Sequence, residues 1–352
     1  MKITMVAGGT GGHIYPALTL ADGLTAKGHE VAFIGSADRM EHKIIPEHGY
    51  CYTAIEVLST RGSLLNKAKS LLSLIRAYFA CLTLLKGQDL VIGFGNYISV
   101  PVALAARHLG LKLVLHEQNS FVGRANRFLE KYADLVIGSY QENLQQFHNP
   151  HTLILGNPQS SKVYGVRKTP AVLKEMGLDP EKKTVVIFMG SLGSDTVNSV
   201  LMDYFKELDG SYQVIYATGS SNYELVKQTV PETAYLKIFE RINGIEVMAN
   251  ADLLVSRAGA TTLAEVTALG VAAILIPSPY VPNNHQFYNG MALCKQNAAM
   301  MIEEKDLSVP ELKLRIAELL MDDDKRRMLA ENAGKMANRQ VLEDIIKEIE
   351  KL

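Results

Sequence analysis

Glycine-rich segments that directly follow apolar runs are the part of this chain best suited to hold phosphate. The first, Gly8-Gly9-Thr10-Gly11-Gly12-His13, precedes a helical pattern that starts at Tyr15. Glycines let the backbone approach a ligand closely, and the start of a helix presents N–H groups to an anion. The segment has neither the glycine spacing of a dinucleotide-binding turn nor the Gly-Lys-Ser/Thr of a P-loop. The alternative is a tight strand–helix turn without a ligand.

Two further segments repeat this arrangement. Gly190-Ser191-Leu192-Gly193-Ser194 follows an apolar run and precedes a helical pattern, and Ser191 is placed to donate to a phosphate oxygen. Gly93-Phe94-Gly95-Asn96-Tyr97 follows another apolar run. The carboxyl ends of parallel strands lie along one edge of a sheet, where ligands gather in open α/β folds. The three segments therefore predict phosphate binding.

Polar residues after later strands are candidates for donor recognition. In the segment Ser256 to Glu265, Thr261 and Thr262 are predicted to cap a helix whose positive end can face a diphosphate. Glu265 either accepts from ribose hydroxyls or simply sits favourably near the helix start. Asn283-Asn284-His285-Gln286 suits recognition of sugar hydroxyls, and its alternative is a solvated loop.

Two other polar groups lie in the first half. His116-Glu117-Gln118-Asn119 ends an apolar strand, which predicts the lining of a cleft. His13 is a candidate general base near neutral pH, although a single histidine is more often a hydrogen-bonded structural group.

Residues 57–86 contain five basic residues and no acidic one, with apolar residues at helical spacing. A basic amphipathic helix of this kind can lie on an anionic membrane surface. The alternative is a core helix with solvated lysines. The residues predicted to dock are Lys67, Lys69, Leu72, Ile75, Arg76 and Phe79.

Strand–helix alternation along the 352 residues predicts two α/β domains, each with a doubly wound, Rossmann-like parallel sheet. The break in this pattern near Gln159–Val163 places a boundary, giving domains 1–160 and 161–338. The final segment, 339–352, is predicted to be a helix that joins the first domain. The strands are expected at Ile3–Ala7, Val31–Gly35, Leu90–Gly93, Leu113–His116, Val185–Met189, Gln213–Ala217, Leu253–Ser256 and Ala273–Ile276.

Bulk composition narrows the class of protein. Hydrophobic residues make up 47% and charged residues 21%, as in ordinary globular proteins. The net charge of −1 gives no case for nucleic-acid binding. Three separated cysteines and the lack of a signal peptide predict a cytoplasmic protein without a zinc site or disulfides. No apolar run reaches the length of a membrane span, so any membrane contact is expected to be peripheral.

Several motifs, in order between residue 5 and about residue 303, closely resemble the peptidoglycan N-acetylglucosaminyltransferases of the GT-B superfamily, in a form like that of Gram-positive bacteria. The motifs that carry the resemblance are Gly-Gly-Thr-Gly-Gly-His, His-Glu-Gln-Asn, Gly156-Asn157-Pro158, Gly-Ser-Leu-Gly-Ser, Arg-Ala-Gly-Ala-Thr-Thr…Glu and Asn-His-Gln.

The resemblance implies two domains facing a cleft and an inverting transfer. N-acetylglucosamine would move from UDP-GlcNAc to the C4 hydroxyl of the muramoyl sugar on lipid I, the undecaprenyl-pyrophosphate-linked precursor, giving lipid II. The first domain would hold lipid I and dock on the cytoplasmic face of the membrane, and the second would hold the donor. From the resemblance, other cell-wall synthesis or division proteins are also expected as partners. No tightly bound cofactor or metal is expected.

The resemblance also assigns residues. His13 matches the residue proposed to take the acceptor proton, with Glu117 as the alternative. Gly9, Gly95, Asn96 and Tyr97 are expected to face the acceptor's pyrophosphate. The expected donor-binding residues, some of which face the cleft from the first domain, are Thr10, Gly11, Gly12, Asn119, Ser191, Ile242, Ala260, Thr261, Thr262, Glu265, Gln286 and Asn289.

One departure from the family concerns charge. The family usually carries an arginine just after Gly-Asn-Pro, where this chain has Gln159 and Ser160. Either the cation is missing or Lys162 or Arg167 supplies it, which puts donor affinity in question.

The rival functions are another GT-B enzyme, such as UDP-GlcNAc 2-epimerase or a glycolipid glycosyltransferase, a Rossmann oxidoreductase, and a nucleotide-binding scaffold without catalysis. The first glycine turn lacks the dinucleotide spacing that an oxidoreductase requires.

Overall fold

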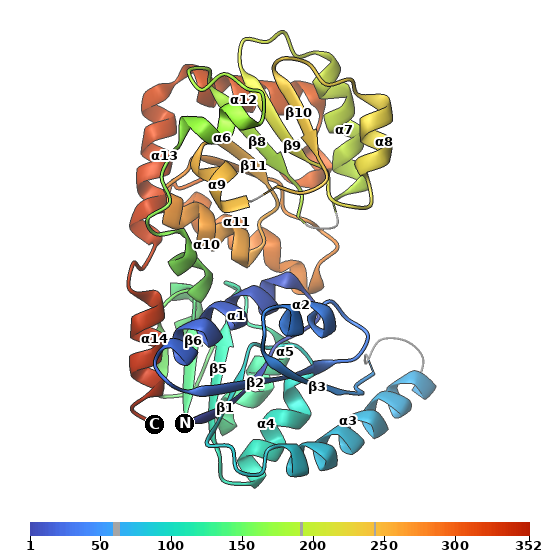
Figure 1. Cartoon of the computed structure of the whole chain (residues 1–352), viewed down its shortest axis with the longest axis vertical. Coiled ribbons are helices and arrows are strands. Elements are labelled where there is room, and N and C mark those ends of the chain that lie inside the picture. Colours follow the sequence, from blue (N-terminus) through green and yellow to red (C-terminus); the bar gives the residue numbers. More distant parts are fainter. Residues whose placement is uncertain (59–63, 191–192, 243) are drawn as a thin grey trace. The chain divides into compact units, whose positions relative to one another are not determined.

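The computed structural model describes residues 1–58, 64–190, 193–242 and 244–352, without the side chains of residues 64, 65 and 67. The chain forms two compact units (Figure 1). Unit 1 comprises Met1–Lys162 and Gln340–Leu352, and unit 2 comprises Val163–Arg339. These divisions lie two residues beyond the predicted 160/161 boundary and one beyond 338/339. The second crossing returns the chain to unit 1.

Unit 1 is built on a seven-stranded sheet in which all neighbouring strands are parallel, in the order β3-β2-β1-β4-β5-β6-β7. Its central strands are buried, as expected for a sheet covered on both faces. The strands are β1 (Lys2–Val6), β2 (Glu30–Ser36), β3 (Cys51–Ile55), β4 (Leu90–Gly93), β5 (Lys112–Glu117), β6 (Leu135–Gly138) and β7 (Thr152–Ile154).

Two apolar cores cover the two faces of this sheet. One contains the buried sides of α1 and α14, and Figure 1 shows these helices side by side. The other contains α3, α4 and part of α5. The helices of unit 1 are α1 (Gly11–Ala26), α2 (Glu41–Glu47), α3 (Leu64–Leu84), α4 (Ser99–His108), α5 (Arg124–Leu129) and α14 (Val341–Ile349), with short 3-10 turns η1 (Glu130–Tyr132), η2 (Gln141–Gln145) and η3 (Pro158–Val163).

Unit 2 has a six-stranded sheet, again with only parallel pairs, in the order β10-β9-β8-β11-β12-β13. The strands are β8 (Thr184–Phe188), β9 (Gln213–Ala217), β10 (Leu236–Phe239), β11 (Leu253–Ser256), β12 (Ala273–Leu275) and β13 (Met300–Met301). The helices are α6 (Pro170–Glu175), α7 (Asp195–Lys206), α8 (Tyr223–Thr229), α9 (Gly244–Ala249), α10 (Ala260–Leu269), α11 (His285–Lys295), α12 (Val309–Met321) and α13 (Asp323–Met336), with turns η4 (Pro282–Asn284) and η5 (Glu304–Asp306).

The predicted fold class is confirmed, and each sheet follows the doubly wound order. In both sheets the strand order reverses next to the first strand, between β1 and β4 in unit 1 and between β8 and β11 in unit 2. Ligands of doubly wound sheets bind outside the carboxyl ends of the strands at such a reversal. These two positions, the switch points, are therefore where a site is expected.

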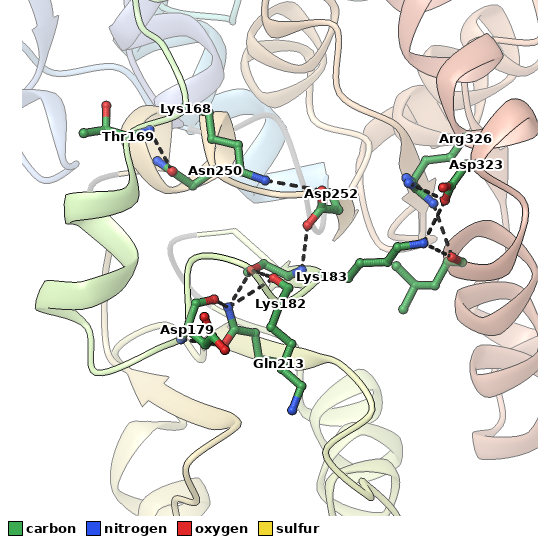
Figure 2. A network of polar contacts seen from close by, with 12 residues as sticks. Lys168, Thr169, Asp179, Lys182, Lys183, Gln213, Asn250, Asp252, Asp323 and Arg326 are labelled. Atoms are coloured by element: carbon green, nitrogen blue, oxygen red, sulfur yellow. Dashed lines mark hydrogen bonds and ion pairs between the residues drawn. The ribbon is translucent and has the colours of Figure 1, made fainter.

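The opposite edge of the unit 2 sheet is held by a polar network (Figure 2). Asp252 accepts from the backbone N–H of Thr184 at 2.8 Å and lies 3.4 Å from the Lys168 ammonium. Gln213 bonds the backbone of Asp179 through both ends of its amide, at 3.0 and 2.6 Å. These side chains satisfy backbone groups of Thr184, at the start of β8, and of Asp179 in the loop before it, so the network has a structural explanation.

Candidate active site

The first glycine segment of unit 1 leads directly into α1, which begins at Gly11 and not at Tyr15 as predicted. Gly11 and Gly12 form its first turn, and Thr10 is the N-cap residue in an extended conformation. The Thr10 side chain makes no capping bond to the backbone. Its hydroxyl instead lies 3.0 Å from Nδ1 of His13, which fixes the histidine ring at the start of the helix.

A buried carboxylate supports this turn from below. Glu41 is fully buried and accepts from the N–H of Gly9 at 3.0 Å and from the hydroxyl of Ser36 at 2.5 Å. A Cβ at Gly8 would run into this carboxylate, and Gly9 has a φ of +85°. The glycines at positions 8 and 9 are therefore required by packing and backbone conformation. Because the N–H of Gly9 already donates to Glu41, it is not the expected pyrophosphate donor.

The third glycine segment lies across the switch point from the first. The Asn96 side chain donates to the carbonyl of Gly8 at 2.8 Å, and its backbone has a φ of 72°. Ser99 donates to the carbonyl of Gly95 at 2.5 Å, and the N–H of Tyr97 bonds the Asn96 side chain. Gly95, Asn96 and Tyr97 thus lie beside the first turn, and their contact with the acceptor's pyrophosphate stays a prediction. Their polar groups chiefly hold the two turns together.

His116-Glu117-Gln118 is core and not the lining of a cleft. The three residues are at most 3% exposed, and only Asn119 of the motif is partly exposed. The Glu117 carboxylate accepts four N–H hydrogen bonds, from the backbone N–H groups of Asn119 and Gly123 and from the side-chain amides of Asn119 and Asn126. Burial raises the pKa of Glu117 and these donors act to lower it. The carboxylate therefore organises the loop after β5.

His116 is a buried neutral residue. Nε2 lies 3.1 Å from the carbonyl of Gly156, and Nδ1 lies 3.0 Å from the amide nitrogen of Gln118. A second proton on the ring would face an N–H donor, and burial lowers the pKa of His116 to about 4. The ring also stacks on Phe94.

In unit 2, α10 begins at Ala260 and its N-cap residue is Gly259. The prediction that Thr261 and Thr262 cap this helix is therefore wrong, because both lie within its first turn. Gly259 has no side chain that could bond the first N–H groups of α10. The hydroxyl of Thr261 is buried and has no hydrogen-bond partner in the part of the chain that the structure describes. Glu265 lies one turn further along α10 and is partly exposed.

Ser191 lies outside the described residues. Of the turn that contains it, the structure describes the residues up to Gly190 and from Gly193 onward. Gly190 and Gly193 have φ values of 84° and 75°, so glycine is required at both. Ser194 is the N-cap of α7 and makes no capping bond. Helix α7 thus begins, like α10, without a hydrogen bond from its N-cap side chain to its first N–H groups.

The other predicted donor residues take different positions. Gln286, at the start of α11, accepts from the N–H of Ser278 at 2.9 Å. Asn289 is fully buried and donates to the carbonyl of Ala258 at 3.2 Å, so its amide ties α11 to the turn after β11. Ile242 is partly exposed, just before α9.

The two residues after Gly156-Asn157-Pro158, where the family usually has an arginine, are uncharged and bonded within the protein. Gln159 is 6% exposed and accepts from the hydroxyl of Thr19 in α1 at 2.9 Å. Ser160 bonds the carbonyl of Asn157. Of the two alternative cations, Lys162 pairs with Asp22 at 3.2 Å, and the exposed Arg167 bonds the carbonyl of Val166.

Helix α3 presents apolar and basic side chains to solvent. Leu72, Ile75 and Phe79 are 48%, 45% and 61% exposed, and Lys69 and Arg76 are exposed beside them. The opposite side of α3 packs on α4. The side chain of Lys67 lies outside the description. No helix in the described ranges combines the length and the hydropathy that a bilayer span requires.

Sequence reasoning missed the residues that hold the turns in place. Glu41 was not predicted, although it follows β2 by a few residues; it is buried and has no ion pair among the described residues. The sequence indicated Arg257 only as part of the Arg-Ala-Gly-Ala-Thr-Thr motif, and it did not predict a role for Glu304. The one signal available was the position of Arg257 directly after an apolar strand. Such a position predicts burial, and a buried charge requires a partner such as Glu304.

Two doubly wound units with glycine turns at their switch points define a GT-B type of protein, and family comparison specifies it. Residues 3–137 match the glycosyltransferase family 28 N-terminal domain, and residues 184–349 match its C-terminal domain. The chain belongs to glycosyltransferase family 28.

Curated relatives match over their full length. A protein of Pediococcus pentosaceus is 35% identical over 100% of both chains, and one of Lactiplantibacillus plantarum is 34% identical over 99% of both. Both are named UDP-N-acetylglucosamine–N-acetylmuramyl-(pentapeptide) pyrophosphoryl-undecaprenol N-acetylglucosamine transferase.

Solved structures agree with this placement. The crystal structure of Acinetobacter baumannii MurG has a TM-score of 0.82 at 25% identity and covers 100% of this chain and 99% of that one. A putative UDP-N-acetylglucosamine 2-epimerase of Listeria monocytogenes has a TM-score of 0.69 at 12% identity, covering 99% and 95%, which shows a shared fold only.

Proposed function

We propose that this enzyme transfers N-acetylglucosamine from UDP-GlcNAc to the C4 hydroxyl of the muramoyl sugar in undecaprenyl-pyrophosphoryl-MurNAc-pentapeptide. The anomeric configuration inverts and a β-1,4 bond forms. The observation that carries the proposal is full-length similarity at about one-third identity to transferases named for this reaction. The two glycine-bounded switch points supply suitable anion sites.

The donor site is proposed at the switch point of unit 2. The first turn of α10, with Ala260, Thr261 and Thr262, would receive the diphosphate, because its N–H groups lack a side-chain cap. The buried hydroxyl of Thr261 is available to such a ligand among the described residues. Further contacts carried by the family resemblance are Ser191 to phosphate, Glu265 to ribose, the backbone near Ile242 to uracil, and Gln286 and Asn289 to the sugar.

The acceptor site is proposed at the switch point of unit 1. The first turn of α1, Thr10 to Gly12, offers N–H groups to an anionic ligand. Gly9, Gly95 and Asn96 shape this turn through the contacts to Glu41 and Gly8. The exposed side of the loop after β5 contributes Asn119.

His13 is the proposed general base. An inverting transfer needs one base to take the proton of the acceptor hydroxyl while its oxygen attacks C1, and a stabiliser for the departing UDP. In the tautomer in which Nδ1–H of His13 donates to the Thr10 hydroxyl, Nε2 is the unprotonated nitrogen that takes the proton. The N-termini of α7 and α10 would stabilise the charge that develops on UDP. No tightly bound cofactor enters this proposal.

The α3 face is the proposed membrane contact. An acceptor with a polyprenyl tail stays in the bilayer, so the enzyme must work at the cytoplasmic surface as a peripheral protein. Leu72, Ile75 and Phe79 supply apolar area, and Lys69 and Arg76, together with Lys67 from the sequence, supply positive charge. Charge reversal of the three cations should abolish cosedimentation with anionic vesicles. Unchanged cosedimentation would refute this docking face.

The reaction is tested by UDP release with and without a lipid I analogue. The transferase releases UDP only with the acceptor, whereas an epimerase acts on UDP-GlcNAc alone. In the same assay, His13→Ala should lower kcat by about 10²–10⁴-fold with little change in UDP affinity. His151→Ala, which alters an exposed histidine of the same unit, is the matched control. A near-normal kcat in His13→Ala would exclude His13 as the base.

A further inference from the structure

Arg257 connects four loops of unit 2 through one buried guanidinium group. The residue follows β11 directly and is 6% exposed. Its Nη2 donates to the hydroxyl of Ser194 at 2.6 Å, and its Nη1 donates to the carbonyl of Ile276 at 3.1 Å. Nη1 also lies 2.6 Å from the carboxylate of Glu304.

These contacts lie along the functional edge of the sheet. Ser194 ends the turn after β8, Ile276 follows β12, and Glu304 follows β13. Strands β8, β11, β12 and β13 are neighbours in that order. Arg257, directly after β11, therefore links Ser194 at the start of α7 to the segments that follow β12 and β13.

The charge on Glu304 explains why a cation can be buried here. The Glu304 side chain is 5% exposed and the Arg257 side chain 8%. Neither carboxylate oxygen of Glu304 has a hydrogen-bond partner among the described residues, so the ion pair offsets only part of the cost of withdrawing two charges from water. The planar fork of arginine can serve the carboxylate and two other acceptors at once, which the point charge of lysine cannot.

Arg257 also determines what the hydroxyl of Ser194 can do. Guanidinium has no acceptor, so the Ser194 oxygen must accept from Arg257 and its own proton is left for another acceptor. Ser194 makes no capping bond to α7, which has 12 residues. The hydroxyl proton is thus held at the N-terminus of a helix, where an anion is favoured.

We propose that Arg257 is a positioning residue for the donor site, paired with Glu304, and that through it Ser194 donates a hydrogen bond to a phosphate oxygen of the nucleotide. The inference rests on the proposed placement of UDP-GlcNAc at the switch point of unit 2. Arg257 itself does not touch the nucleotide. Its function is to hold the Ser194 hydroxyl, at the start of α7, in a fixed position relative to the turn after β11.

A purely structural ion pair would predict a different pattern. Loss of one buried charge destabilises any protein, because the remaining charge has no partner. Stability and donor affinity would then recover together once both charges are removed. A positioning role predicts that stability recovers and donor affinity does not, because the bonds to Ser194 and Ile276 remain lost.

The experiment compares Arg257→Met, Arg257→Met with Glu304→Leu, Arg257→Lys and Ser194→Ala in the full-length enzyme. UDP affinity is measured by calorimetry, Tm by thermal unfolding, and KM and kcat by UDP release. Arg326→Met is the matched control. The Arg326 side chain is 16% exposed and pairs with Asp323 at 2.7 Å, as Figure 2 shows. It also bonds the carbonyl of Leu319 in α12.

We expect Arg257→Lys and the double variant to weaken UDP binding and raise the donor KM about tenfold or more, since one lost charge-assisted bond corresponds to about that factor. The KM for the acceptor should stay unchanged. Ser194→Ala should raise the UDP Kd about three- to tenfold, with a small fall in Tm because one N–H of the buried Arg257 loses its acceptor. Arg326→Met should lower only Tm.

UDP affinity within about twofold of the parent in Arg257→Lys, Ser194→Ala and the double variant would overturn the inference. The proposed donor site fails separately if the parent protein itself does not bind UDP. If Arg257→Met does not fold, Ser194→Ala still decides, because it removes only one partly exposed hydroxyl.

Discussion

Replacing Glu117 by glutamine distinguishes a structural carboxylate from a catalytic one. One oxygen of Glu117 accepts from the backbone and side-chain amides of Asn119 at 3.1 and 3.2 Å, and the other from Gly123 and Asn126 at 3.0 and 2.9 Å. Glutamine presents one oxygen and one NH2 group in the same volume. Two of the four donors would then face another donor.

The least costly rearrangement still leaves one donor without an acceptor. When the new oxygen faces Gly123 and Asn126, the new NH2 faces Asn119, whose side chain can rotate but whose backbone N–H cannot. A buried unpaired donor costs about 1–3 kcal/mol, and a neutral acceptor weakens the remaining bonds by about 1 kcal/mol. We expect a loss of about 2–4 kcal/mol, which lowers Tm by about 5–15 °C in a unit of this size.

Thermal unfolding and UDP release at 20 °C together test this expectation. Glu117→Gln should be less stable and keep a kcat within about threefold of the parent, because its loop stays folded at that temperature. Glu56→Gln, which alters an exposed carboxylate of the same unit, should change neither quantity. A variant with the parent's Tm and a kcat lowered by about 10²–10⁴-fold, as for a lost general base, would refute the reasoning.

Three further predictions concern unit 1. The pKa of His116 is lowered to about 4 in the fold. The unfolded chain therefore binds a proton on His116 at a higher pH than the folded one. The free energy of unfolding has its full value above pH of about 6.5 and falls by about 3 kcal/mol as pH falls toward 4. Urea unfolding across this range should show that loss, and His116→Gln should flatten it. Ile345→Ala removes a fully buried side chain of α14 and should cost about 2–5 kcal/mol in the same assay. Gly9→Ala places a Cβ against the Asn96 side chain at a φ of +85°, so turnover should fall together with stability; an unaffected variant would show that the turn adapts.

The fold was predictable because its main signals are local. The expected strands at Leu90–Gly93, Gln213–Ala217 and Leu253–Ser256 match the structure residue for residue. The missed strands include β7, with three residues, and β13, with two, which are too short to show periodicity. Buried β6 lies within a short apolar run, where periodicity cannot distinguish a strand from a helix.

The candidate site was predictable in position and less so in role. The glycine turns fall at the switch points because carboxyl ends of parallel strands share an edge. The roles of Glu117, Asn96 and Asn289 could not be read, because a polar residue that binds a ligand and one that satisfies a backbone group have the same local sequence. Only three-dimensional contacts such as Asn96 with Gly8, 88 residues apart, distinguish them.

The return of α14 to unit 1 has a consequence for biosynthesis. Val341, Ile345, Ile346 and Ile349 complete the core that α1 begins, and all of unit 2 is translated between them. At about 5–20 residues per second, the ribosome needs about 10–35 s to make the roughly 180 residues of unit 2, after the N-terminal part of unit 1 is complete. During that time the apolar side of α1 lacks its covering helix. Unit 1 therefore cannot complete its core until unit 2 has been translated, and its N-terminal part exposes this apolar surface in the meantime.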